Sequence, residues 1–223
     1  MGRLTWFESD YLSKQVQAVD RIRKLTRDLR RAPSLRGFQD RTVAELLSVV
    51  ALPSTPMIAF LTACRVIKVA KRGDAILMLL QSGLDELVDA FDRHVSHAGL
   101  RQIVESGQSV GATMPSTRDL AVRWRTTGRD VSRITSAELG VGVSGLRIAL
   151  RCRPAIVLVL TTEERISQIA YSSGYEHVSQ LDHDCDRLLG DTPRSLRRRF
   201  RLSSDENIWK KTPDLAMQIE GRF

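Results

Sequence analysis

The stretch RISQIAYSSGYEHVSQLDHDCDRLLG, residues 165–190, restricts the fold of this chain more than any other. Apolar residues at helical spacing predict a short first helix that ends before Gly174. Glycine at that point permits a backbone conformation that other residues adopt with difficulty. A second helix is predicted from about His177, with an apolar side made of Val178, Leu181, Cys185 and Leu188. Two short helices packed across a glycine turn are therefore expected.

The second helix of this pair is unusually acidic. Helices in such an arrangement commonly enter the major groove of DNA, which is a polyanion. Asp184 falls at the edge of the apolar side, whereas Asp182 and Asp186 fall on the opposite side. An aspartate can accept a hydrogen bond from cytosine, but two aspartates near phosphates repel them. His183, three residues before Asp186, is placed to pair with it.

Charge and composition indicate a globular chain with an anionic partner. The chain has 34 Lys and Arg against 26 Asp and Glu, a net charge of +8 and a pI of about 9.9. The excess is spread along the sequence rather than gathered in a basic tail, so a binding surface has to come from folding. Hydrophobic residues at 42% and charged residues at 27% are typical of a folded domain rather than a disordered one.

The cysteines and the apolar segments bear on location. Cys64, Cys152 and Cys185 are widely spaced in apolar settings, which predicts small core residues in a reducing compartment. No segment reaches the roughly 18–20 apolar residues of a membrane helix, and the N-terminus lacks the apolar run of a signal peptide. We therefore expect a cytoplasmic, nucleoid-associated protein without a membrane partner.

The C-terminal half resembles the two-motif DNA-binding domain of the AraC family over about residues 116–200. The residues that carry the resemblance in the second motif are Ile166, Ile169, Ala170, Gly174, Tyr175, Ser179, Gly190, Thr192 and Pro193. A connecting helix fits the family at Arg151, Ala155, Leu158 and Val159, with Pro154 expected in its first turn. The family's fold and its binding of double-stranded DNA are what this resemblance implies.

The first motif matches the family less closely. Leu120, Ala121 and Gly140 stand where the resemblance expects them, but Arg125 replaces the usual turn glycine. Thr135 takes the place of a common buried phenylalanine. In the second motif, phenylalanines are likewise replaced, by Leu181 and Cys185. A smaller core is therefore expected in the second motif.

The first recognition helix carries the better chemistry for reading bases. With Val131 and Ile134 turned inward and Thr127 as the cap, the outer side has two arginines one turn apart, flanked by hydroxyls, a combination that suits guanine and phosphate. The predicted DNA-binding residues of this motif are Thr127, Arg129, Ser132, Arg133 and Ser136. The hypothesis is a division of labour in which the first motif reads bases. The second then binds DNA weakly, reads cytosine or meets a protein.

Further candidates lie in and after the second motif. Its predicted DNA-binding residues are Ser179, Gln180, His183 and Arg187. The run RSLRRRFR follows Pro193 as a basic helix end, and Arg197 and Arg198 are interpreted as phosphate contacts, with a solvated face as the alternative.

The N-terminal half resembles the winged-helix domain of the MarR family over roughly residues 9–108. Helices are predicted at 9–31, at 42–50 and from about Pro56, followed by a β-hairpin of residues 66–70 and 75–80 and a helix from Ser82 to 106. The resemblance implies that the flanking helices 9–31 and 82–106 form a dimer interface, and the apolar stripe at Leu12, Val16 and Val19 is assigned to it.

The same resemblance places a wing and a reading helix. Lys71, Arg72 and Asp74 fall on the wing, which touches the minor groove in that family. The reading helix would face outward with Thr55, Ala59, Thr62 and Ala63, and inward with Met57, Phe60, Leu61 and Cys64. Because no outward residue is Arg, Lys, Asn or Gln, two roles stay open for this half: DNA contact, to which Thr55 would contribute, or a dimerisation or protein-contact module.

The expected fold is mainly α: a winged helix-turn-helix with a small β-hairpin, followed by an all-α double helix-turn-helix domain. The expected divisions are an N-terminal dimerisation helix (1–32), a winged-helix domain (33–112), an AraC-like domain (116–200) and a tail (201–223). The expected function is that of a bacterial transcription regulator, a homodimer on double-stranded DNA that also contacts another regulator or RNA polymerase. The alternative is a regulatory adaptor that uses degenerate DNA-binding folds to bind a protein.

No catalytic pattern is visible, so neither an enzyme nor a cofactor is expected. His94 and His97 lack a matching cluster elsewhere in the sequence, so no metal site is expected either.

Overall fold

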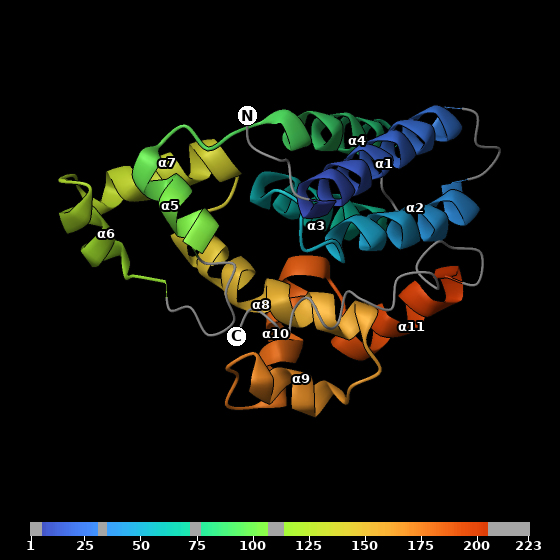
Figure 1. Cartoon of the computed structure of the whole chain (residues 1–223). Helices are drawn as coiled ribbons and strands as arrows, with labels where there is room; N and C mark the ends of the chain where they lie inside the picture. The colour runs from blue at the N-terminus through green and yellow to red at the C-terminus, as the bar shows by residue number, and fades with distance from the viewer. Residues whose placement is uncertain (1–5, 31–34, 72–76, 107–113, 205–223) are drawn as a thin grey trace. The chain divides into compact units, whose positions relative to one another are not determined.

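A computed structural model describes residues 6–30, 35–71, 77–106 and 114–204 of the chain (Figure 1). The described residues divide into two compact units, one ending at Arg93 and the other beginning at His94. All regular structure in the described ranges is helical. The mainly helical fold expected from the sequence is therefore confirmed.

The first unit consists of helices α1 to α4. Their bounds are α1 Trp6–Leu29, α2 Leu35–Val50, α3 Met57–Lys71 and α4 Leu77–Asp92. Helix α3 packs against both α2 and α4, while α1 packs against α4 and α2. The core of the unit therefore gathers around α3, whose large buried side chains include Phe60, Leu61 and Ile67.

The predicted outward face of α3 is buried, which corrects the assignment of a reading helix. Ala59 and Ala63 are fully buried, and Thr55 and Thr62 are 1% exposed. The Thr55 hydroxyl donates to the backbone carbonyl of Val49 at 2.7 Å, so it satisfies the end of α2 instead of facing DNA. The contact of Thr55 with DNA that the sequence suggested is therefore wrong.

The predicted β-hairpin is also wrong in the part of the chain that the structure describes. Residues 66–70 continue α3 as helix, and α4 begins at Leu77 within the second predicted strand. Val66 and Ile67 are buried, and a Cβ on Gly83 of α4 would come within 2.9 Å of Val66. Close packing between α3 and α4 thus outweighs the strand preference of β-branched residues. Of the assigned wing residues, Lys71 ends α3, and Arg72 and Asp74 lie outside the described residues.

The helix expected from Ser82 to 106 is divided by the boundary between the units. Helix α4 ends at Asp92, and α5 begins at Ala98. Residues 94–106 belong to the second unit, so the division lies earlier than the expected boundary at 112.

Only part of the apolar stripe on α1 is buried in the core of the first unit. Ile22 and Leu25 are buried, Val19 is half-buried, and Val16 is 60% exposed. The side chain of Leu12 lies outside the described residues. The subunit interface predicted for this stripe stays a prediction.

The second unit contains seven helices in its described part. They are α5 Ala98–Ser106, α6 Thr117–Arg123, α7 Gly128–Leu139, α8 Val143–Thr161, α9 Ile166–Ser172, α10 Val178–Leu189 and α11 Pro193–Ser204. The long helix α8 contacts α7, α9, α10 and α11 and so joins the two ends of the unit. It begins at Val143, so Pro154 lies in its interior. The sequence had suggested that Pro154 lies in the first turn, and this expectation is wrong.

The three cysteines are buried, as expected from their apolar settings. The sulfurs of Cys152 and Cys185 lie 3.5 Å apart between α8 and α10. Burial and the contact with Cys152 raise the pKa of the Cys185 thiol well above its ordinary value, the contact being the larger cause. Within the described ranges, no helix combines the length and apolar character that crossing a bilayer requires.

Candidate nucleic-acid interface

Helices α6 and α7 meet across a tight turn. A capping box begins α6: the Ser116 hydroxyl accepts from the Asp119 amide, and the Asp119 carboxylate accepts from the Ser116 amide. The Ser116 hydroxyl also donates to the Asp119 carboxylate at 2.7 Å, and this hydrogen bond, followed by that of the Ser116 amide, lowers the pKa of Asp119. At the far end, the amides of Arg125 and Thr126 donate to the carbonyls of Val122 and Ala121. Arg125 takes a positive φ of 52° to make this turn.

Helices α9 and α10 repeat the same turn. The Gly174 amide donates to the Tyr171 carbonyl and the Tyr175 amide donates to the Ala170 carbonyl, each at 3.0 Å. Gly174 has a φ of 81°, where glycine has no steric penalty. Gly140 and Gly190 then end α7 and α10 in the left-handed conformation. The unit therefore carries two helix-turn-helix motifs of matching construction, as the sequence predicted.

Thr127 caps α7, as the sequence predicted. Its side-chain oxygen accepts from the Asp130 amide at 3.2 Å, and its hydroxyl donates to the Asp130 carboxylate at 2.7 Å. Thr126 donates to the same carboxylate at 3.1 Å. These hydrogen bonds, that of Thr127 first, hold the pKa of Asp130 below its ordinary value. The start of α7 is thus fixed by a small network of hydrogen bonds.

The outer side of α7 presents the predicted reading residues to solvent. Arg129, Ser132, Arg133 and Ser136 are all exposed, whereas Val131, Thr135 and Leu139 are buried. Arg133 is paired with Asp130 at 2.9 Å, although its side chain remains 78% exposed. Arg129 has no hydrogen bond or ion pair to any residue that the structure describes. The Ser132 hydroxyl donates to the Gly128 carbonyl at 3.1 Å.

A segment before the two motifs fastens onto the first of them, which sequence reasoning missed. The Ser96 amide donates to the Glu138 carboxylate of α7 at 2.7 Å. The rings of His97 and Trp124 lie 4.4 Å apart, and a Cβ on Gly99 would come within 2.3 Å of the Trp124 indole nitrogen. Ile103 of α5 packs on the small core of the motif, which consists of Leu120, Val131 and Val143. Gly99 was the signal available in the sequence, because a side chain there would collide with the Trp124 ring. Trp124 lies 25 positions further along, so the sequence did not reveal this contact.

The inner side of α10 contains an aspartate. Leu181, Asp184, Cys185 and Leu189 are its buried residues, so Leu189 is more deeply buried than the predicted Leu188. Asp184 accepts from the Arg151 guanidinium, with the Nε contact at 3.1 Å, and from the Tyr175 hydroxyl at 3.1 Å. The Arg151 guanidinium also lies over the Tyr175 ring, 4.7 Å from its centre. Asp184 is 3% exposed, so its charge belongs to the core of the second motif and not to a DNA-facing surface.

The outer side of α10 contains the other two acids. Asp186 is exposed and Asp182 is half-buried, beside exposed Ser179, His183 and Arg187 and half-buried Gln180. The His183 ring nitrogen lies 3.8 Å from the Asp184 carboxylate, so the expected pairing of His183 with Asp186 is not the one observed. This face therefore combines one arginine with two acids, in contrast to the outer face of α7.

Some of the arginines of the basic helix α11 form contacts inside the second unit. The Arg197 guanidinium donates to the carbonyls of Val159 at 2.8 Å and Glu164 at 2.7 Å. Burial, and then the neighbouring Arg201 charge, lower the pKa of Arg197. Arg201 itself is paired with Glu163, whereas Arg198 is exposed. Arg197 thus joins α11 to the end of α8, and Arg198 is the better-placed residue for a phosphate contact.

The match to a known family lies within this unit. Residues 120–199 match the family model of a helix-turn-helix domain. That model is of the AraC type, and the first unit lies outside the match. No curated protein and no solved structure matches the chain. The match indicates a DNA-binding transcription regulator and supports the AraC resemblance drawn from the sequence.

The outer faces of α7 and α10 present charged and hydrogen-bonding side chains of the kind that contact a duplex. In the described part of the chain, no group of three or more His, Cys, Asp or Glu side chains is placed to hold a metal ion. His97 instead accepts from the Leu100 amide at 3.2 Å, close to the start of α5. The candidate interface is thus defined by the outer side chains of α7 and α10 and by the cation of Arg198.

Proposed function

We propose that the chain is a bacterial transcription regulator in which α7 reads bases in the major groove of DNA. One observation carries the proposal: the outer face of α7 exposes Arg129 and Arg133, one turn apart, on a helix capped at both ends. An arginine can donate two hydrogen bonds to one guanine, and serine hydroxyls bind bases or phosphates. Such a regulator works in the cytoplasm, at the nucleoid.

The second motif has a different role in this proposal. Asp182 and Asp186 on the outer side of α10 repel phosphates, and the base donor that best suits an aspartate in the major groove is the N4 amino group of cytosine. Helix α10 therefore contributes weak or cytosine-directed contacts from Ser179, Gln180, His183 and Arg187. Arg198 adds a contact to the phosphate backbone.

The test measures base reading by single arginine substitutions. A preferred site is first selected with the wild-type protein from random duplexes, and each variant is titrated against that site and against a scrambled duplex. Arg129→Ala or Arg133→Ala should weaken binding to the site by roughly 5- to 150-fold, equal to the approximately 1–3 kcal/mol of a bidentate arginine–guanine contact. Binding to scrambled duplex should fall much less.

Arg198→Ala provides the contrast within the same unit. It should weaken binding to both duplexes alike, because a phosphate contact carries no base information. Thermal melting of each variant checks that the unit remains folded. If both α7 variants keep the full preference for the selected site, base reading by α7 is wrong.

The acidic outer face of α10 favours one second candidate, a non-enzymatic regulatory adaptor that binds another regulator or RNA polymerase through its helix-turn-helix surfaces. The two candidates differ in their response to salt. A DNA binder loses affinity for random duplex with a slope of about −0.9 per phosphate contacted. Absence of binding to any duplex at low salt leaves the adaptor alone.

A further inference from the structure

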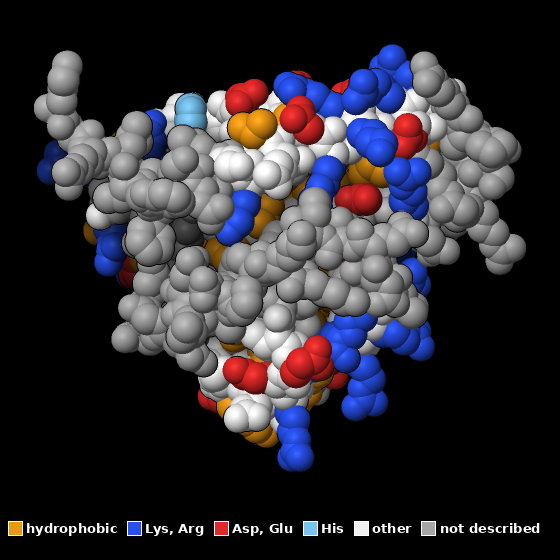
Figure 2. Space-filling model, turned by 45° about the vertical axis from the view of Figure 1, so that its right-hand side comes forward, with side chains coloured by type: hydrophobic (Ala, Val, Ile, Leu, Met, Phe, Trp, Pro, Cys, Tyr) orange, Lys and Arg blue, Asp and Glu red, His pale blue; other side chains and the backbone are white. Residues whose placement is uncertain are grey.

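The second half of α1 carries a strongly basic exposed face. Its cations are Arg21, Arg23, Lys24 and Arg27, with Arg30 directly after the helix, and its acids are Asp20 and Asp28; Arg21 and Asp28 are half-buried and the others are exposed. Basic side chains (blue) gather at the upper right of the space-filling view, over this end of α1 (Figure 2). This face belongs to the first unit, and the candidate interface on α7 and α10 belongs to the second.

Both acids on this face already have an arginine partner. Asp20 pairs with Arg23 at 3.4 Å, and Asp28 pairs with Arg41 of α2 at 3.3 Å. Of the four remaining cations, Arg30 follows the end of α1, and the three within the helix, Arg21, Lys24 and Arg27, are called the α1 ridge. In the described part of the chain, their side chains form no hydrogen bond or ion pair. Like charges at three-residue spacing on a helix repel one another, so the ridge weakens α1 unless an anion binds there.

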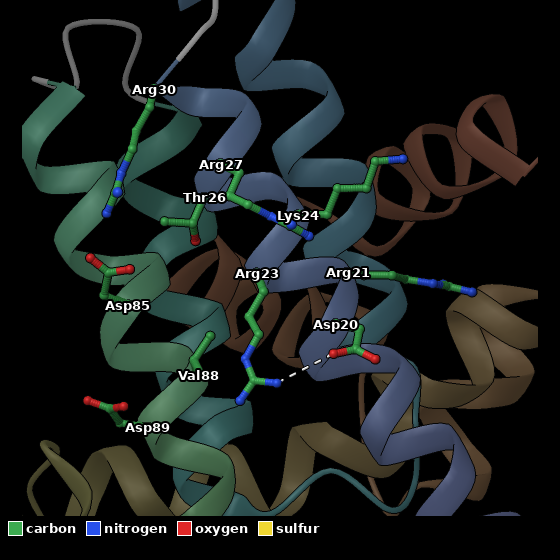
Figure 3. A pocket seen from close by; sticks show the side chains of 10 residues that line it. All are labelled: Asp20, Arg21, Arg23, Lys24, Thr26, Arg27, Arg30, Asp85, Val88 and Asp89. Carbon is green, nitrogen blue, oxygen red and sulfur yellow. Dashed lines mark hydrogen bonds and ion pairs between the residues drawn. The ribbon is translucent and has the colours of Figure 1, made fainter.

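The neighbouring groove does not provide that anion site. An open groove of about 840 Å³ lies between α1 and α4, and its other wall contains Asp85 and Asp89 (Figure 3). The groove is open to solvent and is lined mainly by charged residues, whereas small-molecule sites are mostly apolar and enclosed. Arg21, Lys24 and Arg27 belong to the lining of this groove, and in Figure 3 their side chains extend away from Asp85 and Asp89 on its other wall. The ridge therefore suits an extended anion lying along the outside of α1.

We propose that the α1 ridge binds the phosphate backbone of the duplex DNA that α7 reads. This inference rests on the proposed function, because the DNA-binding motifs keep duplex at a high local concentration around the rest of the chain. The three ridge residues follow one another at about 4.5 Å along the helix axis. A duplex strand carries a phosphate about every 3.4 Å of its axis, within reach of long side chains. The ridge thus adds affinity without sequence preference.

The test is the salt dependence of binding by the full chain with Arg21→Gln, Lys24→Gln and Arg27→Gln combined. The slope of log K against log salt should flatten by about 2–3, since each lost phosphate contact removes about 0.9. Affinity for the selected site and for scrambled duplex should fall by the same factor. The ratio of the two affinities should stay at the wild-type value.

Two further variants make the result specific. Combining Arg65→Gln, Lys68→Gln and Arg93→Gln removes the same charge from elsewhere in the first unit and should leave the slope unchanged. Combining Arg21→Lys and Arg27→Lys keeps the ridge charge and should also keep the wild-type slope. Far-ultraviolet circular dichroism verifies that each variant is folded.

Three outcomes overturn the inference. If the ridge variant keeps the wild-type slope while the wild type prefers its selected site, the ridge proposal fails and the proposed function stands. If the control triple variant flattens the slope equally, the effect comes from net charge and not from contact at the ridge. If the wild type binds no duplex at low salt, the proposed function fails and the ridge proposal fails with it.

Discussion

Arg125 has a backbone conformation that costs free energy in any residue except glycine. Its φ of 52° matches the turn in which the second motif has Gly174. A side chain in the left-handed region crowds the following carbonyl, at a cost of roughly 1–2 kcal/mol. The turn hydrogen bonds and the packing of Leu120 compensate, so the first motif keeps the same geometry as the second. Local strain therefore marks the less regular of the two motifs.

Replacing Arg125 with glycine should stabilise the protein. We expect Arg125→Gly to raise the free energy of unfolding by about 0.5–1 kcal/mol, because relief of strain exceeds the added freedom of the unfolded chain. Urea unfolding followed by circular dichroism measures the change. Gly174→Ala is the reciprocal variant and should lower the free energy of unfolding by about 1–2 kcal/mol. A loss of stability in Arg125→Gly would mean that the arginine side chain provides a stabilising contact that outweighs the strain.

At the scale of elements, the two recognition helices have similar frames and different surfaces. Both are twelve residues long and end at a left-handed glycine. Helix α7 begins with a side-chain cap from Thr127, whereas His177 before α10 provides no such hydrogen bond. Helix α7 also accepts a hydrogen bond from the Ser96 amide through Glu138. Helix α10 accepts one from the Arg151 guanidinium through Asp184, on its buried side. The outer face of α7 thus carries exposed arginine and serine side chains.

The cap of α7 gives a pH dependence with a defined sign. Asp130 has a lowered pKa in the folded chain, so its cap contribution is present above the ordinary value of 3.8 and is lost as the pH falls through the lower folded value. Thr127→Val removes the largest cause of the shift, and we expect the pKa of Asp130 to rise toward 3.8. Carbon-13 NMR titration of the Asp130 carboxylate measures this pKa in both proteins. An unchanged pKa in Thr127→Val would contradict the role of the Thr127 hydroxyl in the cap.

At the scale of the whole molecule, the chain combines an AraC-type unit with a four-helix unit that the family match does not reach. The first unit leaves apolar side chains exposed in its described part, among them Val16 on α1 and Met78 on α4. Dimeric regulators bind two half-sites related by symmetry, which raises both affinity and specificity. An apolar patch on α1 is a suitable place for such an interface.

A homodimer through α1 is therefore our prediction for the assembly. Val16→Asp should convert a dimer at tens of micromolar into a monomer, since a charge buried in an apolar interface is costly. Sedimentation velocity measures the change in mass. Val122→Asp makes the same chemical change at an exposed valine of α6 and should leave the assembly intact. A wild-type protein that is already a monomer at this concentration would end the prediction.

Local sequence determined the helix-turn-helix framework of the second unit. Gly174 has the left-handed conformation expected of it, Thr127 caps α7, and the residues of α7 that the sequence predicts to contact DNA are exposed. Each of these features depends on neighbours within a few positions along the chain, through hydrogen bonds to the backbone or the spacing of apolar residues on a helix. Such interactions can be read from sequence because they need no knowledge of distant contacts.

Tertiary structure decided what depends on distant partners. The composition of residues 66–70 predicts a strand. In the structure they form the end of α3, which packs against both α2 and α4. The sequence places Asp184 at the edge of the apolar side of its helix, but its burial with a charge partner depends on Arg151, 33 positions away. The sequence makes Arg197 a candidate phosphate contact. In the structure its guanidinium donates hydrogen bonds to the carbonyls of Val159 and Glu164. Burial and charge pairing are set by the fold as a whole, since they require residues far apart in sequence to be adjacent in space.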